Sequence, residues 1–284
     1  MWATYNGPIV DAPGSYSGTS SYMGRANAFF TVLPYWKSFY ESNADGSQKD
    51  VRRDVNFVDY AYVWNATTET QDKSYTASSI AKSLYRYPGK WRREWMALGF
   101  VDPNHTGVNY CPLRYADVVL MAAEAYNETN NTTEAWKLLN DVRQRAEATP
   151  ITSANYASLM KAPKVYNLDF IDDSDDAGKF RTALYWERGF ELCYEGQRKY
   201  DFLRWGCLGD ALRAAQAYIE SWYPDANEYI NASTLQSWDP VSWASSNYVA
   251  GHNFVDGKHE LYPIPLAEIQ SNAALNGQNN PGFE

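Results

Sequence analysis

Three glutamates recur at every fourth position in one segment of the sequence, at Glu187, Glu191 and Glu195. On a helix this spacing places all three carboxylates on one face. Paired carboxylates are the groups that hydrolyse glycosidic bonds, but catalytic pairs usually come from different elements across a cleft. Possible partners for the glutamates follow closely in the sequence, at Arg188, Arg198 and Arg204. The pattern therefore favours an internal charge network over a hydrolytic site.

The other residues that could bind a metal or take part in catalysis do not form recognisable motifs. The three histidines lack metal-binding spacings, and the three cysteines match no zinc or redox pattern. An acidic stretch at 169–176 resembles a calcium loop, but with Asp173 as its first ligand the twelfth position would be Leu184 instead of glutamate. Phosphate-binding loops, nucleophile elbows and dinucleotide fingerprints are absent from the sequence. We therefore predict no catalytic residue, no metal site and no cofactor.

Composition excludes some partners and suggests others. The net charge of -9 is opposite to what a nucleic-acid binder needs, so nucleic acid is not an expected partner. The chain contains 11 Trp, 23 Tyr and 11 Phe, and such rings suit a core edge, a protein interface or a sugar-binding surface. Residues 1–11 lack the pattern of a signal peptide. The sequence thus describes either a cytoplasmic protein or part of a longer exported chain.

The periodicity of apolar residues predicts a mainly α-helical chain. Helices are expected at about 113–127 and 133–146, with Thr133 as the N-cap of the second. Further helices are expected at about 179–195, 199–205 and 208–222, and a short helical turn at 266–270.

The chain is expected to form one domain, residues 1–284, with three consecutive parts. Residues 1–110 are loop-rich, residues 111–222 carry the helices, and residues 223–284 are loop-like with an extended C-terminal segment. The first two helices together span 34 residues, which is the length of a tetratricopeptide repeat. An ordinary helical hairpin is the alternative interpretation.

Four stretches in order resemble the SusD/RagB family of outer-membrane nutrient-binding lipoproteins. The first combines residues 90–94 with 112–128, the second covers 135–146, and the third covers 187–206. The fourth combines residues 261–265, Leu-Tyr-Pro-Ile-Pro, with 278–283. The third stretch is the most specific of the four. The resemblance is to the C-terminal half of the family, and it is firm over about 90–284 and loose over 1–89.

This resemblance implies a tetratricopeptide-like helical scaffold with long, irregular, aromatic-rich loops. It also implies a surface-exposed lipoprotein that binds oligosaccharide or polysaccharide without catalysis and passes it to a SusC-like, TonB-dependent outer-membrane transporter. Residues 1–284 are expected to lack the signal peptide, lipidated Cys and N-terminal helices of the family. We therefore expect either part of a longer chain or a missing half that lies on another chain. The matching motif is expected to be structural, and its charged members are Glu187, Arg188, Glu191, Glu195, Arg198, Asp201 and Arg204. Among them Glu191, Glu195, Arg198, Asp201 and Arg204 are expected to pair and to lock two helices at the Gly196 turn.

The ligand-binding residues are expected among aromatic side chains in segments predicted to be loops or to flank them. Sugars present flat C–H patches that pack on aromatic faces, and loops tolerate the variation that specificity needs. The candidates are Tyr16, Tyr22, Tyr35, Trp36, Trp64, Trp238 and Trp243. Two other functions remain open at this stage: a tetratricopeptide-type scaffold for a protein partner and, less favoured, a glycoside hydrolase.

Overall fold

The computed structural model describes residues 34–58, 60–75, 87–90, 111–160, 173–227 and 253–283. The chain divides into two compact units. Unit 1 comprises Met1–Pro163 and Phe170–Arg198, and unit 2 comprises Lys164–Asp169 and Lys199–Glu284. The boundary at residue 198 falls inside the predicted helical part, 111–222, so the two units do not coincide with the three predicted parts. The division into three parts stays a prediction.

A helical hairpin forms the start of the scaffold in unit 1. Helix α3 covers Tyr115–Glu128 and helix α4 covers Thr132–Arg145, which confirms both predicted helices to within two residues. The N-cap of α4 is Asn131 instead of Thr133, because the Asn131 side chain accepts a hydrogen bond from the Glu134 amide. Ala123 of α3 and Ala135 of α4 are completely buried, and such small side chains allow the two helices to pack closely.

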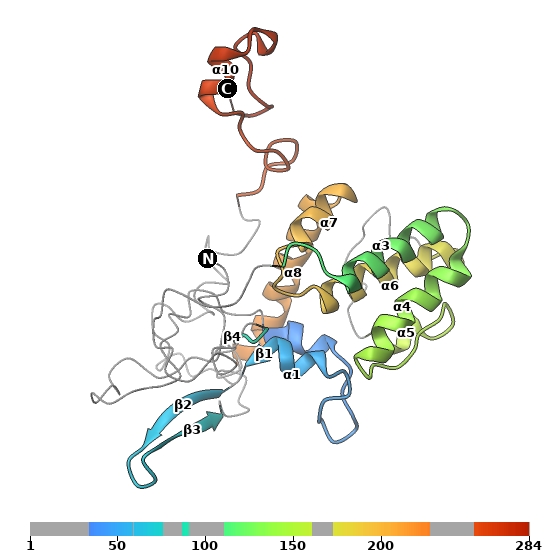
Figure 1. The fold of residues 1–284 in the computed structure, drawn as a ribbon, viewed down its shortest axis with the longest axis vertical. Helices are drawn as coiled ribbons and strands as arrows, with labels where there is room; N and C mark the ends of the chain where they lie inside the picture. The colour runs from blue at the N-terminus through green and yellow to red at the C-terminus, as the bar shows by residue number, and fades with distance from the viewer. Residues whose placement is uncertain are drawn as a thin grey trace. The chain divides into compact units, whose positions relative to one another are not determined.

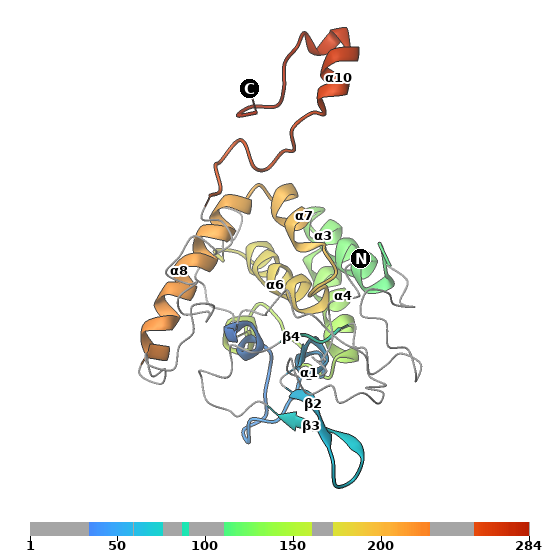
Figure 2. The same cartoon turned by 90° about the vertical axis from the view of Figure 1, so that its left-hand side faces the viewer.

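Helix α6, Asp176–Glu191, packs against both helices of this hairpin (Figures 1 and 2). It begins three residues earlier than predicted, because the Asp175 side chain caps it by accepting from the Gly178 amide. It also ends earlier, at Glu191, so Glu195 lies in the turn that follows. Trp136 of α4 meets Phe180 of α6 edge to face, with ring centroids 5.1 Å apart. The core of unit 1 therefore lies between these three helices.

Shorter elements occupy the described segments before residue 91. They are η2 (Pro34–Phe39), α1 (Arg52–Asn56), β1 (Phe57–Val58), β2 (Tyr60–Asn65), β3 (Thr70–Tyr75) and β4 (Tyr87–Pro88). Strand β1 pairs with β4, and β2 pairs with β3 as an antiparallel hairpin that Figure 1 shows at the edge of the unit. A single helical turn, α5 (Tyr156–Leu159), follows α4. The few strands are short, so the fold is mainly α-helical, as predicted.

Unit 2 contains the remaining described helices. Helix α7 covers Arg198–Arg204 at the unit boundary, and α8 covers Leu208–Asn227. The C-terminal segment 253–283 contains α10 (Leu266–Ser271) and the 3-10 turn η5 (Ala273–Leu275), which confirms the predicted helical turn. None of the residues 253–283 is buried. This segment therefore has no core of its own, and besides its local hydrogen bonds it contacts α7 through Lys199–Tyr262 and α8 through Arg213–Asp256.

Candidate functional site

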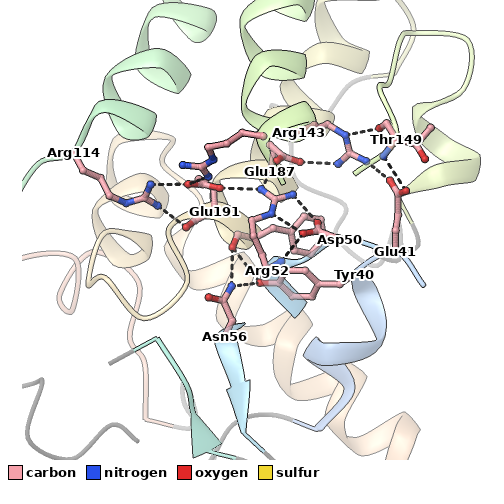
Figure 3. Close-up of polar contacts among 12 residues, drawn as sticks. Tyr40, Glu41, Asp50, Arg52, Asn56, Arg114, Arg143, Thr149, Glu187 and Glu191 are labelled. Atoms are coloured by element: carbon pink, nitrogen blue, oxygen red, sulfur yellow. Dashed lines mark hydrogen bonds and ion pairs between the residues drawn. The ribbon is translucent and has the colours of Figure 1, made fainter. Parts of the chain in front are cut away.

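Glu187 and Glu191, two of the glutamates that the sequence singled out, lie in a buried charge cluster at the C-terminal end of α6 (Figure 3), and Glu195 in the following turn joins it. Glu187 has no exposed surface, Glu191 is 2 % exposed and Glu195 is 8 % exposed. Together with two further carboxylates and five cations, they form a continuous network that we call the charge cluster. Its members are Glu41, Asp50, Lys90, Arg52, Arg114, Arg143, Arg145, Glu187, Glu191 and Glu195.

Glu187 joins two arginines that come from distant parts of the chain. One carboxylate oxygen accepts from the Nη1 of Arg52 at 2.6 Å, and the other accepts from the Nη1 of Arg143 at 2.7 Å. Arg52 belongs to α1 and Arg143 to α4, so this carboxylate ties three helices together. None of the three side chains is more than 9 % exposed. Their charges are therefore stabilised by one another and not by water.

Each of the two arginines is held by further groups. Asp50 accepts two hydrogen bonds from Arg52, at Nε (2.8 Å) and Nη2 (2.6 Å), in the bidentate geometry that suits a guanidinium. Arg143 donates to the Thr149 carbonyl at 2.8 Å and to the Glu41 carboxylate. Glu41 in turn accepts from the Thr149 amide at 3.1 Å. The side-chain donors are thus used within the protein, as burial of charge requires.

The Glu191 carboxylate forms ion pairs with three arginines. Its carboxylate accepts from Arg52 at 3.1 Å, from the Nη1 of Arg114 at 2.6 Å and from Arg145. Burial by itself would raise the pKa of this carboxyl, but the attraction of Arg52 and Arg114 prevails and lowers the pKa to about 2. Glu191 is therefore an anion at every ordinary pH.

Glu195 closes the cluster beyond the end of the helix. It accepts from the Nε of Arg114 at 2.6 Å and forms an ion pair with Lys90. Burial lowers the pKa of the Lys90 ammonium, and the attraction of Glu195 opposes that shift.

The cluster also satisfies the backbone at the end of α6. The last carbonyls of a helix have no partner within it. The Glu191 carbonyl accepts from Lys90 at 2.7 Å and from Arg114 at 2.6 Å, so two cations lie where the helix dipole is negative. The Phe190 carbonyl accepts from the Tyr40 hydroxyl at 3.1 Å and from Asn56 at 3.2 Å. The same groups therefore balance charge and cap the helix.

This arrangement suits a structural role and is poorly suited to hydrolysis. A glycosidase needs one carboxyl whose pKa is raised so that it carries a proton near neutral pH, and it needs access for the sugar. The Glu191 pKa is shifted the opposite way, and the oxygens of Glu187 and Glu191 are occupied by arginines. The charge cluster thus binds the elements of unit 1 together.

The partners of the three glutamates differ from those expected. Arg188 donates to Asp117 of α3 at 2.8 Å, and Arg198 donates to the Tyr185 carbonyl at 2.7 Å while stacking on the Tyr185 ring. Arg204 pairs with Asp201 one turn away within α7, at 3.2 Å. The glutamates instead pair with Arg52, Arg114, Arg143, Arg145 and Lys90. Arg188 follows Glu187 on α6, where adjacent residues point in different directions, and Arg198 and Arg204 belong to α7. Nearness along the chain therefore did not predict the partners.

One missed partner left a signal in the sequence and others did not. Arg143 lies four residues after Leu139 and three before Ala146, on the apolar face of a predicted helix, where an unpaired charge would be costly. That position could have identified it. Arg52, Asp50 and Glu41 come from an irregular segment without periodicity, so their burial could not be inferred.

The aromatic candidates fall into two groups. Tyr16, Tyr22, Trp238 and Trp243 lie outside the described residues. Tyr35 and Trp36 lie in η2 and Trp64 lies in β2, so all three are in regular structure where a loop or its flank was expected.

Trp36 packs inward. Its ring is 5.5 Å from that of Phe190 and 5.9 Å from that of Trp186 between centroids. Two of its ring atoms would lie 3.2 Å from a Cβ at position 189, so Gly189 allows this close approach. The ring of Trp36 thus helps to hold η2 against α6, and the ligand contact expected of it stays a prediction.

Comparison with known proteins relates the chain to one protein family. The sequence model of the SusD family matches residues 30–283. A SusD-like protein of Formosa agariphila is 31% identical over 172 residues, which cover 61% of this chain and 24% of the relative. A second SusD-like protein of that organism is 30% identical over 247 residues, 84% of this chain and 38% of the relative.

A solved structure agrees in fold. A SusD homologue from Bacteroides thetaiotaomicron aligns with 99% of this chain at a TM-score of 0.65 and 24% identity, and 48% of that protein is covered. The chain thus spans less than half the length of these relatives. Because the family match extends over nearly the whole sequence, the chain belongs to the SusD family.

Proposed function

We propose that this chain is the glycan-binding part of a SusD-like nutrient-uptake protein. It holds oligosaccharide or polysaccharide at the outer surface of the bacterial outer membrane, within a lipid-anchored protein, and delivers the glycan to a SusC-like, TonB-dependent transporter. The observation that carries this proposal is the family match over residues 30–283.

The proposed role is binding without catalysis. It is supported by the charge cluster, in which the glutamates of the family-like motif are buried and neutralised by arginines. In the described part of the chain, no helix is both long enough and apolar enough to cross a bilayer.

A binding screen on the whole chain tests the proposal. The protein is applied to a glycan array, and each positive glycan is then titrated by calorimetry and incubated with the protein for product analysis. We expect saturable binding and unchanged glycan. Alanine at Tyr16 and Tyr22, the loop candidates set among small polar residues, should weaken binding while the melting temperature stays constant. Shortened products that accumulate in proportion to protein would contradict the non-catalytic role.

A protein-interaction scaffold is the second candidate, and the surface of α3 favours it. Large apolar side chains are exposed along this helix: Tyr115 is 81 % exposed, Tyr126 is 42 % and Met121 is 42 %. Exposed apolar patches commonly mark protein contacts. If this surface binds protein, Tyr115→Glu should reduce association with a co-purified partner and leave glycan binding unchanged.

A further inference from the structure

A tight turn follows η5 in unit 2, and its two central residues are Asn276 and Gly277. Both have positive φ, 48° and 75°, and the Gln278 amide donates to the Leu275 carbonyl across the turn at 2.8 Å. Positive φ at both central positions is the mark of a type I′ turn, which asparagine followed by glycine adopts most readily. The backbone geometry of the turn therefore suits these two residue types.

The same two residues can react with each other. The Gly277 nitrogen can attack the side-chain carbonyl carbon of Asn276, and glycine has no Cβ to hinder the approach. A new C–N bond forms, the proton of the attacking amide passes to the departing amide nitrogen, and ammonia leaves a cyclic succinimide. Water then opens the ring at one of its two carbonyls. One opening gives aspartate, and the other gives isoaspartate, in which the former side chain has become part of the main chain. Water is the only co-reactant.

The structure leaves this pair accessible. Asn276 and Gly277 are exposed, and a Cβ added at Gly277 would meet no atom within 4 Å beyond its chain neighbours. Among the described residues, neither the Asn276 side chain nor the Gly277 amide has a hydrogen-bond partner. At an Asn276 ψ of 37° the Gly277 nitrogen points away from the side chain, so the turn must open before the ring can close. Such opening costs little in a segment without buried residues.

The other asparagines that follow Lys258 lack one of these features. The side-chain oxygens of Asn272 and Asn279 accept hydrogen bonds from main-chain amides, at 3.1 and 2.7 Å. Asn280 precedes a proline, whose nitrogen carries no hydrogen. Of these four asparagines, Asn276 alone combines an unbound side chain with a glycine nitrogen next to it.

We propose that Asn276 is a site of spontaneous modification in the folded protein, where it converts to isoaspartate and aspartate at a rate set by opening of the turn. Isoaspartate adds a carbon to the main chain, so the Leu275 carbonyl and the Gln278 amide no longer meet. Asn279 follows directly and accepts from the Ile264 amide at 2.7 Å, so this product also weakens that contact. Aspartate keeps the turn, because it tolerates positive φ. This site is independent of the proposed glycan binding.

Ageing of the whole chain tests the proposal. The protein is kept in mildly alkaline buffer, sampled over time and digested with trypsin, so that the peptide after Lys258 carries all four asparagines. We expect Asn276 to gain the mass difference between an amide and a carboxyl group, in two forms of which isoaspartyl methyltransferase labels one. Asn272 in the same peptide should stay unchanged and is the internal control. Asn276→Gln, whose longer side chain disfavours the ring, should leave the peptide unchanged.

Hydrogen exchange at the Ile264 amide tests the structural consequence. It should be faster in the aged protein than in fresh protein, and Asn276→Asp should exchange like fresh protein. Unchanged exchange in aged protein that contains isoaspartate would show that the product does not disturb the segment.

Three results would overturn the site itself. If Asn276 reacts in urea but not in the folded protein, the turn protects the pair. If Asn272 converts as fast as Asn276, the turn and its glycine confer no selectivity. If neither residue converts in either state, the pair is unreactive.

Discussion

The end of α6 and the C-terminal segment 253–283 hold their shape by opposite means. At the end of α6, Glu187 and Glu191 are buried and bind cations that are 44 to 139 positions away in the sequence. In the C-terminal segment no residue is buried. There Asn279 accepts from the Ile264 amide at 2.7 Å, and Asn280 donates to the Tyr262 carbonyl at 2.7 Å.

This difference determines how much each region loses when one contact is removed. A buried ion that loses its partner has no water to replace it, so the cost is large. An exposed amide that loses its partner binds water instead, so the net cost is small. The contacts are similar in length in the two regions, so burial and not distance sets their contributions to the free energy of unfolding.

The largest effect is expected from Glu187→Ala. The substitution leaves both Arg52 and Arg143 without the carboxylate that joins them, in a site where Glu187 has no exposed surface. Breaking a buried pair typically costs about 3–5 kcal/mol, so the free energy of unfolding should fall by that order. Urea denaturation followed by circular dichroism measures it.

Glu134→Ala is the matched control for this substitution. Glu134 also lies on a scaffold helix and pairs with Lys137 at 2.8 Å, but both side chains reach solvent. Its urea midpoint should remain close to that of the parent. Equal losses for the two substitutions would show that burial does not distinguish these ion pairs.

The second effect is a loss of stability in acid that depends on Glu191. Its pKa is lowered from 4.5 to about 2 in the folded protein. A carboxyl with a lowered pKa stabilises the fold above its unfolded pKa, and this contribution disappears as the pH falls from about 4.5 to about 2. The shift corresponds to about 3 kcal/mol.

Urea midpoints measured at several pH values between 5 and 2 test this expectation. The parent should lose stability steeply over that range. Glu191→Gln should start lower at pH 5 and lose less on acidification, because it has no carboxyl to protonate. Parallel curves for the two proteins would mean that Glu191 does not carry the pH dependence.

The sequence predicted the helices better than the contacts between them. Apolar periodicity placed α3, α4 and the body of α6 correctly, since it reports which face of a helix is buried. It also singled out Glu187 and Glu191, which the structure buries among cations. It could not find Arg52 or Asp50, because they come from a segment without periodicity, and pairing over 135 positions is a property of the fold. The caps at Asn131 and Asp175 depended on single hydrogen bonds and shifted the helix starts.

The smallest effect is expected from Asn279→Ala in the C-terminal segment. The substitution removes the side-chain oxygen that accepts from the amides of Ile264 and Asn280. Because these residues are partly exposed, water replaces the acceptor, and the loss should be roughly 1 kcal/mol or less. The urea midpoint of the whole protein should hardly move, but the Ile264 amide should exchange its hydrogen faster. Gln278→Ala, one position earlier, should leave that exchange rate as it is. A global loss as large as that of Glu187→Ala would show that the segment is part of the cooperative core in spite of its exposure.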